Sequence, residues 1–176
     1  MTIGEGRPQV GILMGSDSDW ETMEAAAERL AAFEIPYEVQ VCSAHRSPKV
    51  VVQYATKARG RGIGVLIVGA GGAAHLAGVV AAYTTLPVIG VPVASGALGG
   101  LDALLATVQM PAGVPVATVA IGRGGAENAA ILAVQILALK NRSLRKQLDD
   151  FKQELAGSVE GKNLRLQRKV FPDRID

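Results

Sequence analysis

Short apolar runs rich in β-branched residues alternate with longer helical patterns along most of this sequence. The apolar runs are residues 10–14, 37–42, 64–68, 88–91 and 116–121. The helical patterns between them are residues 19–33, 48–59, 73–83 and 101–108. Each run is almost continuously hydrophobic, as in strands that are covered on both faces. Alternation repeated this often predicts a three-layer α/β fold, in which about five parallel strands carry helices on both faces.

The length of 176 residues favours one domain. We expect a polar N-terminal segment at 1–9, a single α/β catalytic domain at 10–156 and a C-terminal arm at 157–176. Residues 126–139 are apolar nearly all round, which suits a central or inter-subunit helix, and residues 143–156 form an amphipathic helical pattern.

Composition and charge exclude several classes of protein. The net charge is only +2, and its basic excess lies in residues 140–176 without interleaved aromatic residues, which argues against nucleic-acid binding. One cysteine, Cys42, excludes an internal disulfide framework and suits a reducing compartment. Residues 1–9 lack the apolar core of a signal peptide, and the apolar stretch 65–82 is interrupted by four glycines and His75. These features predict a cytoplasmic protein with no membrane association.

Two helix starts carry capping signals. Ser18 is followed three residues later by Glu21, which predicts a capping box at the start of the first helix. Ser47 precedes Pro48, so a cap residue stands directly before a proline at the first helical position.

Open parallel sheets bind ligands beyond the carboxyl ends of their strands. The loops that follow the first three runs are residues 15–19, 43–48 and 69–75, and they contain both histidines of the chain. These loops are therefore where we look for chemistry.

The first loop, Gly15-Ser16-Asp17-Ser18-Asp19, opens a helix. A helix N-terminus favours anions, so Ser16 and Ser18 are candidates to hold a phosphate, with Asp19 accepting hydrogen bonds from sugar hydroxyls. Simple helix capping by these side chains is the alternative reading.

The second loop contains His45 and Arg46. The guanidinium fork of Arg46 suits a phosphate. His45 is a candidate acid/base, because an unperturbed imidazole titrates near neutrality. A purely structural histidine is the alternative.

The third loop, Gly69 to His75, fits the loose form of a dinucleotide-binding fingerprint. That fingerprint requires an acidic residue about 20 positions later, and residues 86–100 contain none, so a nicotinamide cofactor is not expected. His75 is either a second polar contact or a helix cap. The chain also contains no zinc-ligand spacing, no P-loop and no nucleophile elbow.

Six stretches of the chain resemble the bacterial class I 5-(carboxyamino)imidazole ribonucleotide mutases of purine biosynthesis. They are MGSDSDW (14–20), SAHRSP (43–48), GAGGAAHL (69–76), PVIGVPV (87–93), VQMPAGVPVATVAIG (108–122) and ENAAILAVQIL (127–137). They occur in order across most of residues 10–140, which is far more specific than any single motif.

The resemblance implies a flavodoxin-like domain assembled as an octamer, which uses no metal, nucleotide cofactor or ATP. It implies that a carboxylate moves from the exocyclic nitrogen of the substrate to ring carbon 4, with His45 as the general acid/base. Ser16 and Arg46 would hold the phosphate, and Asp19 the ribose. The residues that would line the base and the CO2 pocket are Ser43, Ala44, Ala70, Gly71 and Leu76.

Two alternative functions remain at this level. The same site could carboxylate aminoimidazole ribonucleotide with free CO2, although the AAHL segment resembles the mutase branch. A non-catalytic flavin- or nucleotide-binding module is the alternative of another class, and the few aromatic residues argue against flavin stacking. Confinement of CO2 is expected from walls formed by Gly71, Gly72 and Ala73.

Overall fold

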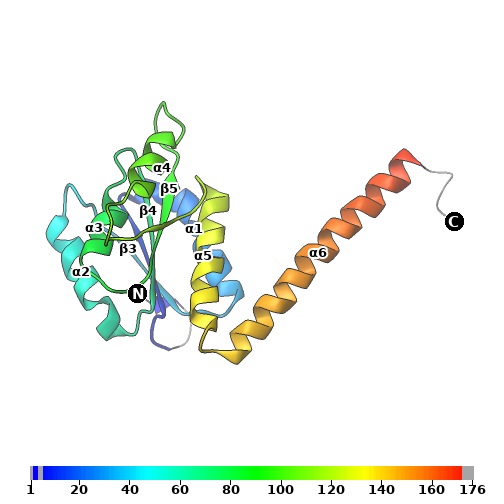
Figure 1. The fold of residues 1–176 in the computed structure, drawn as a ribbon, viewed down its shortest axis with the longest axis horizontal. Coiled ribbons are helices and arrows are strands. Elements are labelled where there is room, and N and C mark those ends of the chain that lie inside the picture. Colours follow the sequence, from blue (N-terminus) through cyan, green and yellow to red (C-terminus); the bar gives the residue numbers. More distant parts are fainter. Residues whose placement is uncertain (1, 4–5, 172–176) are drawn as a thin grey trace. The chain divides into compact units, whose positions relative to one another are not determined.

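The computed structural model describes residues 2–3 and 6–171, and the chain divides into two compact units, Met1–Leu137 and Ala138–Asp176. Figure 1 shows the order of the elements along the chain. The strands are β1 (Thr2–Ile3), β2 (Val10–Met14), β3 (Tyr37–Val41), β4 (Val65–Gly71), β5 (Val88–Val93) and β6 (Ala117–Thr118). The helices are the 3-10 turn η1 (Asp17–Asp19), α1 (Trp20–Ala32), α2 (Pro48–Arg61), α3 (Leu76–Ala82), α4 (Leu101–Val108), α5 (Arg123–Ala138) and α6 (Arg142–Val170).

The sheet has the strand order β1-β3-β2-β4-β5-β6. β2 to β6 pair in parallel, whereas the short β1 pairs antiparallel with β3 and was not expected from the polar N-terminal segment. Without β1, the order of the parallel strands is that of flavodoxin-like sheets, with a reversal beside the first strand of the parallel set. The predicted three-layer, flavodoxin-like α/β fold is confirmed.

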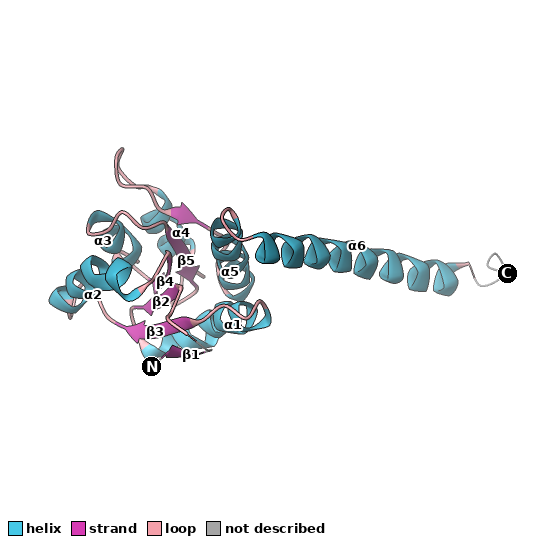
Figure 2. Cartoon of the chain, turned by 90° about the horizontal axis from the view of Figure 1, so that it is seen from below, coloured by secondary structure: helices cyan, strands magenta, loops and turns pink. Residues whose placement is uncertain are grey.

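The three central strands β2, β4 and β5 are apolar and buried on both faces, whereas β3 (YEVQV) is partly exposed. Along β4, Leu66 and Val68 pack with residues of α2, α3 and α4 in one core cluster. Gly69 lies on the opposite face, where the side chain of Met23 from α1 covers it. Figure 2 shows α2 and α3 on one side of the sheet, and α1 and α5 on the other.

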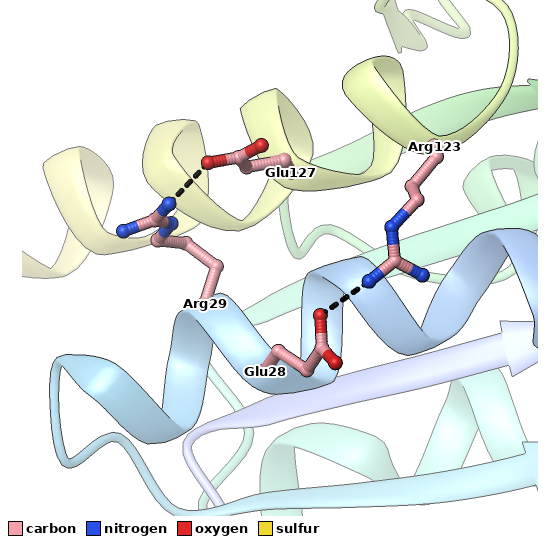
Figure 3. A network of polar contacts seen from close by, with 4 residues as sticks. All are labelled: Glu28, Arg29, Arg123 and Glu127. Atoms are coloured by element: carbon pink, nitrogen blue, oxygen red, sulfur yellow. Dashed lines mark hydrogen bonds and ion pairs between the residues drawn. The ribbon is translucent and has the colours of Figure 1, made fainter.

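Two ion pairs join α1 to α5 on the outer side of their shared layer (Figure 3). Arg29 pairs with Glu127, and Arg123 pairs with Glu28 over 2.6 Å. The second pair is more than half exposed on both sides, so it contributes little free energy. The apolar contacts beneath these charges therefore hold the layer together.

Several element boundaries differ from the sequence prediction. β6 is only two residues long, because it is an edge strand with β5 as its single partner. α3 begins at Leu76 rather than residue 73, since Gly72 and Ala74 both adopt positive φ angles, which a helix cannot accommodate.

The capping box at the first helix also differs. It is formed by Ser16 and Asp19 at η1, and the predicted pair of Ser18 and Glu21 does not form it. The extra 3-10 turn moves the cap two residues toward β2. At α2, Pro48 is the first helical residue as predicted, but the Ser47 side chain makes no cap bond and contacts Ser43 instead.

The second unit is dominated by α6, a single helix of 29 residues. It begins at an Asn141 cap, whose side chain accepts hydrogen bonds from the backbone of Ser143 and Leu144. The helix runs through position 157, where the sequence analysis placed the start of a separate arm. Among the described residues, no helix combines the length and hydrophobicity needed to cross a bilayer.

Adjacent glycines at the start of α5 provide a test of the packing. A Cβ at Gly125 would overlap the backbone carbonyl of Ala120, whereas a Cβ at Gly124 would meet nothing within 4 Å. We expect Gly125→Ala to lower the free energy of unfolding by about 3 kcal/mol or more, because backbone atoms cannot rotate away. Gly124→Ala should be neutral or stabilising by up to about 1 kcal/mol. Urea denaturation of both variants measures the two free energies of unfolding. Equal stability of the variants would contradict the close packing of Gly125 against Ala120.

Candidate active site

A cavity of about 420 Å³ lies where β2, β3, β4 and β5 reach the carboxyl edge of the sheet. All eleven predicted site residues line this cavity. Its lining consists of Gly15, Ser16, Ser18, Asp19, Ser43, Ala44, His45, Arg46, Ala70, Gly71, Ala74, His75, Leu76 and Ser95. Parallel strands therefore bring together residues that are up to 80 positions apart in the sequence.

The first loop combines capping with exposure to the cavity. The Ser16 side chain caps η1, and its backbone N–H donates to Asp19 Oδ2 over 3.1 Å. The Ser18 hydroxyl lies 2.9 Å from that of Ser16. Both alternatives from the sequence hold here, because Ser16 caps the turn while it and Ser18 still line the cavity.

Asp19 is a buried carboxyl at the floor of this loop. Burial raises the pKa of Asp19, and the backbone N–H groups of Ser16 and Gly15 and the nearby Arg46 oppose that rise. The Asp19 carboxyl, a hydrogen-bond acceptor, thus lies between the backbone of the first loop and Arg46 of the second.

The second loop folds back so that Arg46 reaches the first loop. The Arg46 guanidinium donates to the carbonyl oxygen of Gly15 over 3.0 Å. Its backbone N–H donates to Ser43 Oγ over 3.2 Å, while the Ser43 N–H donates to Ser47 Oγ over 2.9 Å. The Arg46 guanidinium is therefore held at the first loop, and it lines the cavity together with the hydroxyl-bearing residues Ser16 and Ser43. This arrangement suits a phosphate group.

The two histidines of the chain contact each other. His45 Nε2 lies 2.8 Å from His75 Nδ1, and the rings meet edge to face with centroids 4.9 Å apart. Only one of these two nitrogens donates a hydrogen at a time, so the pair shares one bridging proton. The sequence named both histidines but not their pairing, because their approach across β2 depends on the strand order. His75 makes no side-chain cap bond to α3.

The third loop forms the apolar side of the cavity. Ala70, Gly71, Ala74 and Leu76 line it, and Ala74 holds an unusual positive φ of 43°. Gly72 and Ala73, which the sequence analysis placed in the walls, are absent from the lining. The positive φ angles of Gly72 and Ala74 turn the chain between them and present Ala74 instead.

Sequence reasoning did not assign Gly15, Ala74 or Ser95 to the site. Ser95 lies just beyond β5, so the rule that located the other loops would also have found it. The fourth strand was predicted to end at residue 91, however, and it ends at Val93. No three metal-ligating side chains gather anywhere within the described ranges 2–3 and 6–171.

Comparison with known proteins places this site in a family context. A family model described as AIR carboxylase matches residues 9–158. The N5-carboxyaminoimidazole ribonucleotide mutase of Mycobacterium tuberculosis H37Rv is 58% identical over 168 residues, which are 96% of this chain and 95% of that protein. The Bacillus subtilis protein of the same name is 56% identical over 87% of this chain and 94% of its own length. The crystal structure of Treponema denticola PurE matches with a TM-score of 0.82 at 29% identity, covering 92% of this chain and all of that chain.

The buried carboxyl makes a pH-dependent contribution to stability. Because the pKa of Asp19 is raised above 3.8, this carboxyl stabilises the fold fully below that pH, and the contribution is lost as the pH rises through the folded-state pKa. Asp19→Asn removes the titration. We therefore expect the unfolding free energy of the parent protein, relative to Asp19→Asn, to decrease as the pH is raised from about 3 to about 6. Denaturant titrations at several pH values measure it, and an increase would show that Arg46 and the N–H groups dominate.

Proposed function

Since this chain belongs to the AIR carboxylase family, we propose that it is an N5-carboxyaminoimidazole ribonucleotide mutase. Such an isomerase moves a carboxylate from the exocyclic nitrogen of its substrate to ring carbon 4. The observation that carries this proposal is 58% identity to a protein of that name over 96% of the chain. The convergence of all eleven predicted residues on one cavity supports it independently.

The phosphate end of the substrate belongs at the first two loops. Ser16, Ser18 and Arg46 supply hydroxyl and guanidinium donors there, and Asp19 lies beside them to accept from ribose hydroxyls. The imidazole then extends toward β4. The residues that would surround the base are Ser43, Ala44, Ala70, Gly71, His75 and Leu76.

The chemistry requires one proton to move and return. Protonation of the exocyclic nitrogen lets its bond to the carboxylate break, which releases CO2 and leaves an electron-rich ring. Carbon 4 then attacks the CO2, a new carbon–carbon bond forms, and the proton on carbon 4 must leave. His45 delivers the first proton and collects the second, so the cycle closes without a net proton. His75, in contact with His45 Nε2, orients this imidazole.

The remaining task is to keep CO2 in the site. Ala70, Gly71, Ala74 and Leu76 form an apolar wall with few groups that hold water. Confinement beside carbon 4 raises the effective concentration of CO2, so recapture outruns escape. The reaction thus uses the residues of this chain, and no cofactor is part of the proposal.

A carboxylase that takes free CO2 and aminoimidazole ribonucleotide is the second candidate, because the family model carries that description. It would use the same loops and only the second half of the cycle. Product formation from the carbamate substrate alone, compared with that from aminoimidazole ribonucleotide plus bicarbonate, distinguishes the two.

Assembly and cellular context belong to the proposal as well. We place the enzyme in purine (IMP) biosynthesis in the cytoplasm, where the buried free thiol of Cys42 would remain reduced. A homo-oligomer, an octamer by family resemblance, fits the unpartnered apolar side chains on two helices. Leu101, Leu105 and Val108 of α4 are about half exposed, as are Leu155, Val159, Leu166 and Val170 of α6.

The direct test is an ultraviolet assay of 4-carboxy-5-aminoimidazole ribonucleotide formation without ATP or added metal. We expect the parent protein to convert the carbamate substrate and His45→Asn to lose about 10²–10⁴-fold in kcat, because proton transfer is removed. Calorimetry should show product binding retained in this variant. Normal turnover by His45→Asn would refute its assignment, and an inactive parent protein would refute the proposed function.

Arg46 is expected to act through binding. Arg46→Ala should weaken substrate affinity about 10–100-fold, because a charge-assisted hydrogen bond to phosphate is lost. The matched control is Arg59→Ala, since Arg59 bonds Thr85 and does not line the cavity. The effect of each substitution is measured from KM for the substrate and Kd for the product. Equal effects of the two substitutions would remove Arg46 from the phosphate site.

A further inference from the structure

Ser95 is a cavity residue for which the substrate scheme above has no role. It stands two positions after the end of β5, and its hydroxyl faces the same cavity as Ser16, Ser18 and Ser43. The Ser16 hydroxyl donates to Asp17, the Ser18 hydroxyl donates to that of Ser16, and the Ser43 hydroxyl accepts from Arg46. Within the part of the chain that the structure describes, the Ser95 hydroxyl has no hydrogen-bond partner, so its donor is free for a ligand.

Ser95 is exposed, and it approaches the backbone of β4 closely at Gly71. A Cβ at position 71 would overlap Ser95 Oγ and lie 3.0 Å from Ser95 Cβ, so only glycine at 71 lets the serine approach. The segment that carries Ser95 ends at Gly100, where φ is 90° and a Cβ would lie 2.7 Å from Ile121. Ser95 therefore approaches the backbone of Gly71 at the cavity wall, in an exposed segment (residues 94–99) that ends at a closely packed glycine.

The strand order sets which end of a substrate meets Ser95. β5 lies two strands away from β2, which carries the phosphate loop, and neighbouring strands are about 4.8 Å apart. Ser95 is thus separated from Ser16 by roughly 10 Å along the sheet edge. With the phosphate at the first loop, the imidazole and its carboxylate lie at the β4 and β5 end.

That end of the cavity contains few hydrogen-bond donors. Its walls are Ala70, Gly71, Ala74 and Leu76, and Arg46 is committed to the phosphate end. A carboxylate moved into such surroundings needs a donor in place of water. Among side chains of the cavity, the histidine pair, the Ser43 hydroxyl and the Ser95 hydroxyl can supply it, and Ser95 is the one that follows β5.

We propose that Ser95 donates a hydrogen bond to the substrate carboxylate and so makes the site prefer the carboxylated imidazole ribonucleotide over its decarboxylated form. This assignment rests on the proposed function and deepens it. A site built to bond a polar group discriminates strongly against the analogue that lacks the group. Ser95 is thereby a specificity-determining residue, and it is placed by β5, whose following loop has no other role in the substrate scheme.

The test compares two ligands by calorimetry, 4-carboxy-5-aminoimidazole ribonucleotide and 5-aminoimidazole ribonucleotide. We expect Ser95→Ala to weaken binding of the first about tenfold, as for a hydrogen bond to a charged group, and of the second by less than about twofold. Ser95→Thr keeps the hydroxyl and should restore most of the preference. Leu98→Ala alters an exposed side chain of the same segment that does not line the cavity, and should leave both affinities unchanged.

The possible failures are distinguishable. If the parent protein binds neither ligand, the proposed function fails and this assignment falls with it. If the parent protein binds both, and Ser95→Ala weakens both equally or neither, only the role of Ser95 is overturned. A loss of preference in Leu98→Ala equal to that in Ser95→Ala would assign the effect to the segment and overturn the role of the hydroxyl.

Discussion

The site depends on one geometric constraint, the common direction of neighbouring strands. β3, β2, β4 and β5 all end at the same edge of the sheet, so the four loops that follow them must meet there. The crossover helices lie on the two faces of the sheet (Figure 2). The candidate site residues lie in the last two positions of β4 or within five residues after a strand end. The helices contribute little chemistry, but they bury both faces of the sheet and so hold its edge in place.

Close backbone approach is the second requirement, and small residues provide it. Gly71 admits the close approach of Ser95, and Gly69, two residues earlier in β4, admits Met23 of α1. A Cβ at Gly69 would overlap the side chain of Met23, and a Cβ at Gly71 would overlap that of Ser95. Gly71 also lines the cavity together with Ala70, so this part of β4 contributes both to the packing and to the apolar wall that would confine CO2.

Charge in the cavity is arranged by position along the sheet edge. Arg46, the serine hydroxyls and Asp19 gather where β2 and β3 end, while the β4 and β5 end is almost without charge. The histidine pair lies between the two ends, because it joins the β3 loop to the start of α3 over β2. A phosphorylated ligand would thus be oriented by its anionic group at one end, with its ring placed against the proton carrier.

The sequence by itself predicted the fold class, the five parallel strands with ends that differ by up to three residues, and eleven residues that line one cavity. Hydrophobic runs and loop motifs are local properties, so they can be found without coordinates. Only the tertiary structure decided the contact between His45 and His75, the reach of Arg46 to Gly15 and the approach of Ser95 to Gly71. Each of these joins residues from different strand ends, and their distances follow from strand order and backbone turns. The same reason explains the displaced capping box at Ser16, the shortened β6 and the late start of α3, since tertiary pairing and positive φ angles overrode local preference there.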